Sequence, residues 1–434
     1  MTAGYNEDTR RKELFEKKSA RVAASYLRRI KELPDMPKEM EPFLDVLENV
    51  HVHFSDVEHE TQQKTVGTFC IMVPNELIYA AGGVPVRLCS GSYTAYAVGD
   101  ETVPRDACPL VKAVMGMGDI RMSKAFENCS LLAVPITCDC KKKIAGMLKR
   151  VKPTVMLHVP PMKGTDADME QYLQELYRLV SVLEKTTGNR VTEQTLAESI
   201  NQIGYAQYEM SRFLKYRRCD PALLHGTQVM AVMNSYAYMP VWKWAAQMGR
   251  LNAEMEKRLS ERKFIGRDNQ PRILITGSPV TFPNIKVPLL IEEMGGRLVA
   301  DETCLGERAL YDPVTVVDNS FDGMMRALAG RYTRPCDCPV FVDNKQRLYR
   351  IRQMIKAHKV DGVVYHVLRG CLVYDYEYKI MEEELGAMDI PVIRVESDYN
   401  EEDVEQLRIR IEAFIELIKL KNYAKQKKEG DRHG

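Results

Sequence analysis

The sequence predicts an α/β protein built from two similar Rossmann-like lobes with parallel sheets, joined by a helical segment. Three observations predict this fold. Short apolar runs typical of β-strands alternate with helical patterns in two separate stretches of the 434-residue chain. Helical patterns alone fill the stretch between them, and the two α/β stretches share landmarks in the same order. The length suffices for two such lobes and a connector.

The elements follow one another in five segments. Apolar residues at helical spacing within the charged stretch 8–32 indicate an amphipathic helix that serves packing or dimerisation. Thr165 and Thr192 are expected to N-cap helices of the connector, and Gly188 to end one. The expected segments are an N-terminal helical segment at 1–50, a first α/β lobe at 51–164, a helical connector at 165–265, a second α/β lobe at 266–421 and a frayed polar tail at 422–434.

The two α/β stretches carry matching landmarks. "PNELIYAAGGVPVRL" at 74–88 and "NIKVPLLIEEMGGRLV" at 284–299 both indicate a helix that ends at a Gly-Gly pair and is followed by a strand. Cysteines keep the same step, because Cys338 follows Cys108 by 230 residues and Cys371 follows Cys138 by 233. We therefore expect two lobes of one design with cysteines at corresponding turns.

The composition excludes several classes of function. The 61 basic residues are balanced by 60 acidic ones, whereas a nucleic-acid binder normally has a basic excess. The charged N-terminus has no apolar h-region, and no window approaches the roughly 18 apolar residues of a membrane span. We expect a cytoplasmic protein without a nucleic-acid or membrane partner. In a reducing compartment its 11 cysteines are not expected to form a disulfide framework.

The cysteines predict a metal centre between the lobes. Cys138 and Cys371 each follow a strand-like run, "SLLAVPIT" and "GVVYHVLRG", and ligands of open α/β sheets gather at the carboxyl ends of strands. Thiolates that converge from both lobes suit a soft metal centre. Neither the C-x2-C pairs of structural zinc sites nor the C-x2-C-x2-C run of ferredoxins occurs, which favours a cluster held by distant turns. Taken singly, each cysteine could instead be a small buried hydrophobe.

Six motifs that occur in order resemble the 2-hydroxyacyl-CoA dehydratase and benzoyl-CoA reductase superfamily over about residues 10–420. The resemblance implies that Cys108, Cys138 and Cys371 bind an iron-sulfur cluster, and that an ATP-hydrolysing activator with its own 4Fe-4S cluster supplies electrons. The chain has no Walker-type nucleotide motif, which fits that division of labour. The motifs are "GTFCIMVPNELIYAAGGVPVRL", "DACPLVK", "TCDCKKK", "DETCLGER", "RPCDCPV" and "DGVVYHVLRGCLVYDYE".

The chain is most similar to the branch of double-cubane cluster proteins, because it carries both Cys336 and Cys338 and has paired lobes in one chain. That similarity implies a homodimer in which six cysteines hold an 8Fe-9S double cubane in the cleft, and a reductase activity on a small unsaturated molecule such as acetylene. Cys70, Cys304 and Cys338 are expected to complete the set, with Cys336 as the substitute for Cys338.

Other interpretations stay open. The chain could be a single 4Fe-4S subunit of a 2-hydroxyacyl-CoA dehydratase or benzoyl-CoA reductase, or a non-catalytic electron carrier. Second-sphere or structural thiols remain the alternative for Cys70, Cys304 and Cys338, and the four cysteines at 89, 129, 140 and 219 are expected to be structural. Among the three lysines at 141–143, at least two are expected on a solvated helix face. No histidine is assigned as a catalytic acid.

Overall fold

The computed structural model describes residues 2–49, 63–119, 124–266 and 270–433. Up to the end of the first sheet, the elements are α1 (Thr2–Glu32), η1 (Lys38–Met40), α2 (Glu41–Asn49), β1 (Thr65–Thr68), α4 (Asn75–Ala80), β2 (Val84–Arg87), α5 (Tyr93–Gly99), α6 (Pro109–Asp119), α7 (Lys124–Asn128), β3 (Cys129–Ile136), α8 (Asp139–Leu148) and β4 (Thr154–His158). They are followed by α9 (Asp166–Thr187), α10 (Glu193–Arg217), α11 (Gly226–Ser235), α12 (Val241–Ser260), β5 (Arg272–Gly277), α13 (Lys286–Glu293), β6 (Arg297–Glu302), η2 (Glu307–Ala309), α14 (Phe321–Thr333), α15 (Lys345–Ala357), β7 (Gly362–Leu368), α16 (Leu372–Ala387), β8 (Val392–Ser397) and α17 (Val404–His433).

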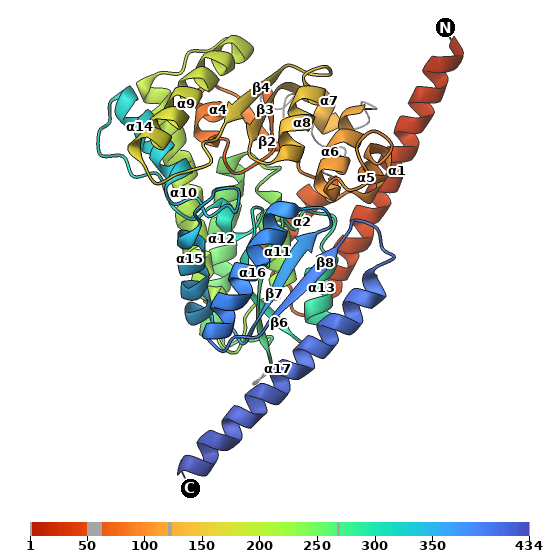
Figure 1. Ribbon diagram of the computed structural model, residues 1–434, viewed down its shortest axis with the longest axis vertical. Coiled ribbons are helices and arrows are strands. Elements are labelled where there is room, and N and C mark those ends of the chain that lie inside the picture. The colour runs from red at the N-terminus through yellow and green to blue at the C-terminus, as the bar shows by residue number, and fades with distance from the viewer. Residues whose placement is uncertain (1, 50–62, 120–123, 267–269, 434) are drawn as a thin grey trace.

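Two parallel sheets form the centres of the two lobes, one above the other in Figure 1. Within the described residues each sheet has four strands, ordered β2-β1-β3-β4 in the first lobe and β6-β5-β7-β8 in the second, and all neighbours are parallel. The two orders are the same winding. The predicted α/β fold with two similar Rossmann-like lobes is confirmed.

The central strands are buried along their whole length because helices cover the sheets. Every residue of β1, β5 and β7 is buried, as expected where a parallel sheet is covered on both faces. The Gly-Gly landmarks have the predicted role: Gly82 and Gly295 take positive φ angles of 73° and 90° directly after α4 and α13, and a strand follows each pair. The internal repeat therefore exists in three dimensions.

The segment between the sheets is helical, with α9, α10, α11 and α12 and no strand among its described residues. Thr165 and Thr192 each N-cap their helix through a hydrogen bond from the backbone N–H three residues later, and both complete a capping box. Gly188 ends α9 at φ 81°. These three predictions are confirmed.

Two helices hold the lobes together. Lys12 and Arg29 of α1 form ion pairs with Glu127 beside the first sheet and with Glu293 of α13 in the second lobe, so α1 runs along both lobes (Figure 1). Helix α14 comes from the second half of the chain but packs against α9, where its apolar face joins the core over the first sheet. Part of the expected second-lobe segment 266–421 therefore contributes to the core of the first lobe.

The C-terminal tail differs from the expectation. Helix α17 continues to His433 instead of fraying after residue 421, because the Lys, Ala, Gln and Glu residues that follow are good helix formers.

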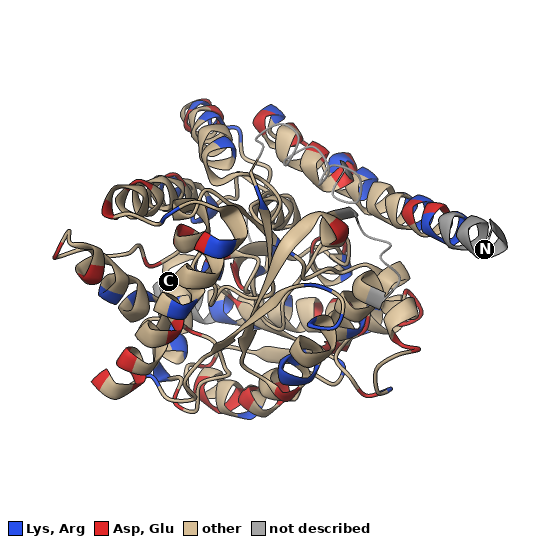
Figure 2. Cartoon of the chain, turned by 90° about the horizontal axis from the view of Figure 1, so that it is seen from above, with Lys and Arg blue, Asp and Glu red and all other residues tan. Residues whose placement is uncertain are grey.

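The expected start of the first lobe, residue 51, lies outside the described residues. Seen from above, α1 carries basic and acidic residues interspersed along its length (Figure 2). None of the described helices is both long and apolar enough to span a membrane.

Candidate functional site

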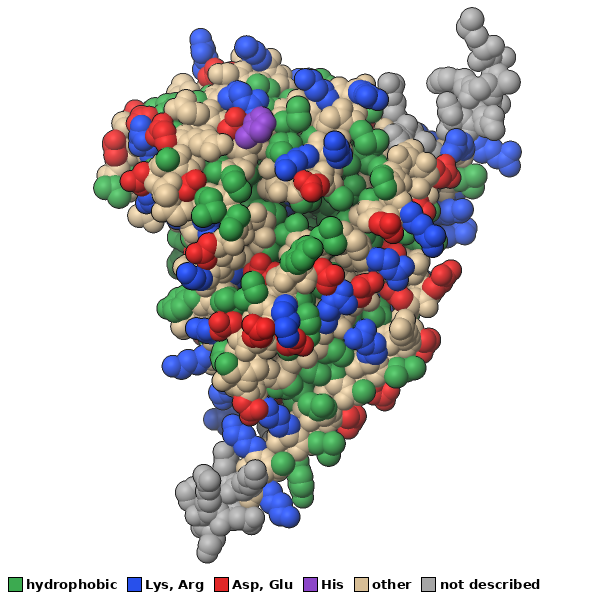
Figure 3. Space-filling view, viewed as in Figure 1, with side chains coloured by type: hydrophobic (Ala, Val, Ile, Leu, Met, Phe, Trp, Pro, Cys, Tyr) green, Lys and Arg blue, Asp and Glu red, His purple; other side chains and the backbone are tan. Residues whose placement is uncertain are grey.

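A cavity of about 180 Å³ lies between the lobes, where the carboxyl ends of both sheets meet. The face in Figure 3 is hollowed between the lobes near α8 and α16, and apolar side chains gather around the hollow. Eight of the chain's 11 cysteines line the cavity. They are Cys70, Cys89, Cys108, Cys138, Cys140, Cys304, Cys338 and Cys371.

The strand ends explain why so many thiols meet here. Cys70, Cys89 and Cys138 each stand two positions after the last residue of β1, β2 and β3, and Cys304 stands two positions after β6. Cys371 follows β7 by three positions. In both lobes the central pair of strands, β1 with β3 and β5 with β7, is the point where the strand order reverses, which is where doubly wound sheets bind ligands.

Cys108, Cys138 and Cys371 share a second feature, because each directly precedes the first residue of a helix. Backbone N–H groups of the first helical turn donate to all three sulfur atoms. The positive end of a helix stabilises negative charge on such a sulfur. The cavity therefore receives three helix N-termini, α6 and α8 from the first lobe and α16 from the second.

Cys108 and Cys371 form a hydrogen bond across the two lobes. The bond from Cys108, with further donors from Ser278 and the backbone of Tyr374, lowers the pKa of the Cys371 thiol to about 7. The same bond, together with burial, raises the pKa of Cys108 well above its ordinary value. Within the pair, the pKa of Cys371 is therefore the lower one.

Two cationic side chains of the first lobe face the cavity. Lys141 in the first turn of α8 donates to Cys70, and the neighbouring thiols raise the pKa of the ammonium although burial opposes this. Burial alone would raise the pKa of Cys70, but the Lys141 charge and a backbone N–H hold it below its ordinary value. Arg87 is buried against the cavity and donates through Nε to Thr68 Oγ1 over 3.3 Å. Lys142 and Lys143 are exposed, as expected.

Cys338 and Cys336 occupy different places. Cys338 lines the cavity, whereas Cys336 packs behind it in a small apolar cluster with Cys70, Cys304 and Cys338. Burial raises the pKa of Cys336 to about 12. The structure therefore brings Cys338, rather than its substitute, together with the other five predicted ligands. Cys338 does not begin a helix as Cys108 does, since the next helix, α15, starts only at Lys345.

Sequence reasoning missed two cavity cysteines. Cys89 and Cys140 are expected from the sequence to be structural, yet both line the cavity. The Cys89 thiol donates to the Phe69 carbonyl over 3.2 Å, and burial raises its pKa to about 11. The spacing after the strand could have found it, because Cys89 follows β2 as Cys304 follows β6. Cys129 and Cys219 lie outside the cavity lining.

The donor set fits a polynuclear cluster better than a single ion. No three of the His, Cys, Asp and Glu residues in the described part of the chain converge closely enough to hold one metal ion. A single zinc needs all its sulfur ligands about 2.3 Å from one point, whereas a cluster presents separate iron atoms to separate thiolates. Thiols spread around an apolar cavity match the second case.

His366, the histidine nearest in sequence to a predicted ligand, is a core residue. It is buried in β7, and its Nδ1 and Nε2 contact the Ser278 carbonyl at 3.3 Å and Ser397 Oγ at 2.7 Å. Burial lowers its pKa to about 4. Both ring nitrogens are occupied and the ring is neutral, so it offers no proton to the cavity.

Comparisons with known proteins agree with this picture. Residues 70–418 match the family described as 2-hydroxyglutaryl-CoA dehydratase, D-component. The chain is 30% identical to the putative dehydratase subunit YjiM of Escherichia coli (strain K12), over 88% of this chain and 99% of that protein. It is 24% identical to the (R)-phenyllactyl-CoA dehydratase beta subunit of Clostridium sporogenes, over 87% and 97% of the two chains. Identity to a benzoyl-CoA reductase subunit of Thauera aromatica is 21%, over 84% and 93%.

Proposed function

The chain belongs to the 2-hydroxyglutaryl-CoA dehydratase D-component family, in the superfamily of 2-hydroxyacyl-CoA dehydratases and benzoyl-CoA reductases, and from this premise we propose that it is an ATP-dependent iron-sulfur reductase. Its relatives are named as subunits of dehydratases and reductases, and the chain is an enzyme of this superfamily. In the proposed function an 8Fe-9S double cubane lies between the lobes. A separate ATP-hydrolysing activator, carrying its own 4Fe-4S cluster, supplies the electrons.

The observation that carries the proposal is that thiols of both lobes line one cavity, five from the first lobe and three from the second. As ligands we propose Cys70, Cys108 and Cys138 of the first lobe and Cys304, Cys338 and Cys371 of the second. A single cubane takes at most four cysteine ligands, so it would leave thiols of this apolar cavity without a metal. Two cubanes that share a bridging sulfide take three each. More thiols than a single cubane can bind, contributed by both lobes, support the larger cluster.

The side chains around the cavity suit reduction of a small molecule. When bound, the cluster supplies electrons at low potential. Helix N-termini, Lys141 and Arg87 stabilise the negative charge of the thiolates, and apolar walls that include Phe69, Leu110 and Leu305 exclude water.

The second candidate is a single-cubane subunit of a 2-hydroxyacyl-CoA dehydratase or benzoyl-CoA reductase. It is favoured by the relatives that are named as subunits of such enzymes, which align over nearly their whole length. In this case Cys108, Cys138 and Cys371 at the three helix starts hold the cluster, and a different subunit completes the enzyme. For the double-cubane reductase we also propose a homodimer and a cytoplasmic location. We do not propose either for the single-cubane subunit.

Iron and acid-labile sulfide per chain, measured after purification without oxygen, test the proposal. About eight irons per chain support the double cubane, and about four support the single-cubane subunit. Serine substitution of Cys338 should lower the iron content, whereas Cys336→Ser and Cys140→Ser should not. A wild-type chain that holds no iron after reconstitution would overturn both candidates. Reduction of acetylene to ethylene with the activator and ATP then separates a reductase from a CoA-dependent subunit.

A further inference from the structure

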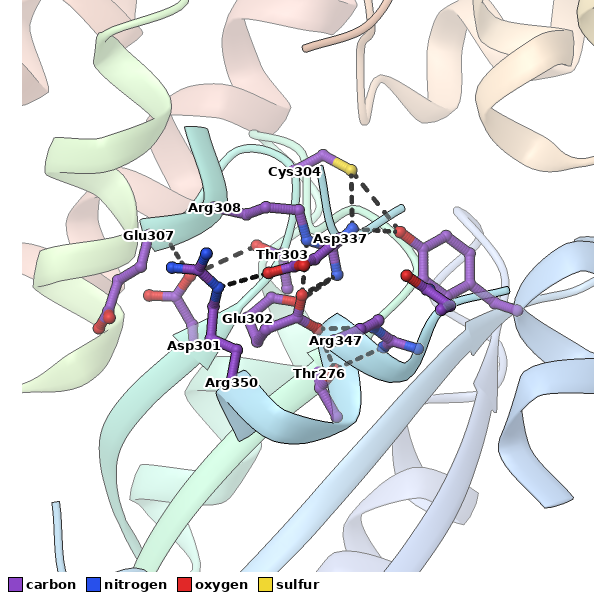
Figure 4. Close-up of polar contacts among 12 residues, drawn as sticks. Thr276, Asp301, Glu302, Thr303, Cys304, Glu307, Arg308, Asp337, Arg347 and Arg350 are labelled. Carbon is purple, nitrogen blue, oxygen red and sulfur yellow. Dashed lines mark hydrogen bonds and ion pairs between the residues drawn. The ribbon is translucent and has the colours of Figure 1, made fainter. Parts of the chain in front are cut away.

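Cys304 differs from the other cavity cysteines in its polar neighbours. Arg308 Nη1 lies 3.4 Å from the Cys304 sulfur and donates to it (Figure 4). The Tyr374 hydroxyl lies 3.6 Å from the same sulfur. Arg308 belongs to the short helix η2 that follows Cys304, and Tyr374 lies in the first turn of α16. The contact therefore joins two turns of the second lobe that are 66 residues apart.

The orientation of the Arg308 guanidinium is fixed by its other partners. Nε donates to Glu302 Oε1 over 2.6 Å, Nη2 to the Glu302 carbonyl over 3.0 Å, and Nη1 to the Tyr374 hydroxyl over 2.8 Å. The arginine side chain is 1% exposed. Because every nitrogen has a partner and water has no access, Nη1 is held toward the sulfur.

The same contact orients the hydroxyl of Tyr374. Its oxygen accepts from Arg308, so its own hydrogen remains to be donated, and the Cys304 sulfur is the acceptor within reach. Tyr374 also lines the cavity. A Cys304 thiolate, which has no hydrogen to donate, thus receives two hydrogen bonds, one from a cation and one from a neutral hydroxyl.

Arg308 belongs to a buried network of ion pairs with Glu302, Arg347 and Glu377. Glu302 is fully buried and shares its carboxylate with Arg347, whose Nε donates to Oε2 over 3.1 Å. Arg347 is held further by Thr276 at 2.8 Å (Figure 4) and by an ion pair with Glu377 at 3.0 Å. Glu302 contacts Arg308 through Nε and Nη2, which leaves Nη1 directed to the sulfur and to Tyr374.

We propose that Arg308 and Tyr374 are positioning residues that raise the reduction potential of an iron-sulfur cluster bound through Cys304. This inference rests on the proposed function. Reduction adds negative charge to a cluster and its thiolates, and hydrogen bonds to the sulfur stabilise that charge, so the reduced state gains more than the oxidised one. The charged donor contributes more than the neutral one.

A redox titration of the anaerobically purified full-length protein, followed by optical and EPR spectra, tests the inference. Tyr374→Phe should keep the wild-type iron content and shift the midpoint potential to a more negative value. Arg308→Met should shift it further, and Arg308→Lys should recover part of the shift because it restores a cationic donor. Matched controls are Tyr378→Phe and Arg217→Lys, since Tyr378 bonds Glu382, Arg217 bonds Asp301, and neither side chain belongs to the cavity lining.

The outcomes separate this inference from the proposed function. Midpoint potentials of Tyr374→Phe and Arg308→Met that equal the wild-type value, at full iron content, would overturn the inference and leave the proposed function standing. A shift in the controls as large as in the variants would also overturn it, because general loosening of the core would then explain the effect. If Arg308→Met loses its iron, the midpoint potential of Tyr374→Phe alone tests the inference: a more negative value supports it and the wild-type value overturns it. A wild-type chain without iron would overturn both.

Discussion

The two lobes share one backbone design but treat charge around the cavity differently. Both wind their four strands in the same order, and both place cysteines directly after strands and before helices. In the first lobe the cations that face the thiols are Lys141, a half-buried side chain on α8, and Arg87. The second uses a fully buried network of Arg308, Arg347 and Glu302. The repeat thus preserves the positions of the thiols, while each lobe has its own electrostatics.

The most severe test asks whether equivalent cysteines are equally necessary. Cys138 and Cys371 both begin a helix after a central strand, one in each lobe. Serine at either position should abolish cluster-dependent reductase activity, by more than about 100-fold, because a direct ligand matters more than residues that merely support one. Iron content and activity of both variants measure this. Cys219→Ser, outside the cavity, should keep both, and retained iron in either test variant would contradict the symmetry.

A second test contrasts the two kinds of charge. Arg347→Met removes one partner of a buried ion pair and should lower the free energy of unfolding by about 3 kcal/mol. Lys141→Met removes a half-buried cation and should cost about 1 kcal/mol or less. Urea unfolding of the metal-free protein measures both values. Equal losses of unfolding free energy in the two variants would contradict the expectation that the fully buried cation contributes more to stability than the half-buried one.

The contact between the lobes gives a third test. Gly370 precedes Cys371 with φ 73°, and a Cβ there would lie 2.3 Å from the Asp106 carbonyl oxygen of the first lobe. Gly370→Ala should therefore destabilise the protein by at least about 2 kcal/mol, through backbone strain and through overlap across the junction. Gly386→Ala is the control, because a Cβ there meets nothing within 4 Å. A neutral Gly370→Ala would show that the lobes separate easily.

The smallest expected effect concerns pH and the second lobe alone. His366 has a pKa of about 4 in the folded protein because burial disfavours the charged ring. The unfolded chain, with an ordinary value near 6.5, binds the proton more readily, so stability falls as pH drops from about 7 to 5, by about 2 kcal/mol from this residue. His366→Gln should lose less stability over that interval than wild type. Equal losses in urea titrations at both pH values would contradict this.

Local signals in the sequence were sufficient for much of the fold. Thr165 and Thr192 could be predicted as caps because a capping box involves only four consecutive residues. The Gly-Gly pairs indicate the same turn in both lobes. The convergence of Cys138 and Cys371 could be predicted because strand ends of parallel sheets share one edge. Cys108 is implied by the family resemblance, and Cys338 is expected from its match to Cys108 in the repeat.

Contacts between distant segments could not be predicted. Nothing in the apolar face of α14 says that it packs on α9 rather than on its own lobe, since periodicity shows that a face is buried but not what covers it. Cys89 and Cys140 escaped prediction as cavity residues because the family resemblance implies other ligands. The bond from Arg308 in η2 to Tyr374 in α16 joins two helices that are far apart in the sequence, and their meeting depends on tertiary packing.

The arrangement of the thiols also has a consequence for biosynthesis. Cys70 leaves the ribosome 301 residues before Cys371, and α14, which completes the core over the first sheet, is made late in translation. Domains generally fold as units during synthesis, the N-terminal one first, but here the first lobe lacks both α14 and half of the cavity wall until the second lobe emerges. For the proposed cluster, this order requires that the nascent first-lobe thiols stay reduced until then and makes cluster insertion a late step of maturation.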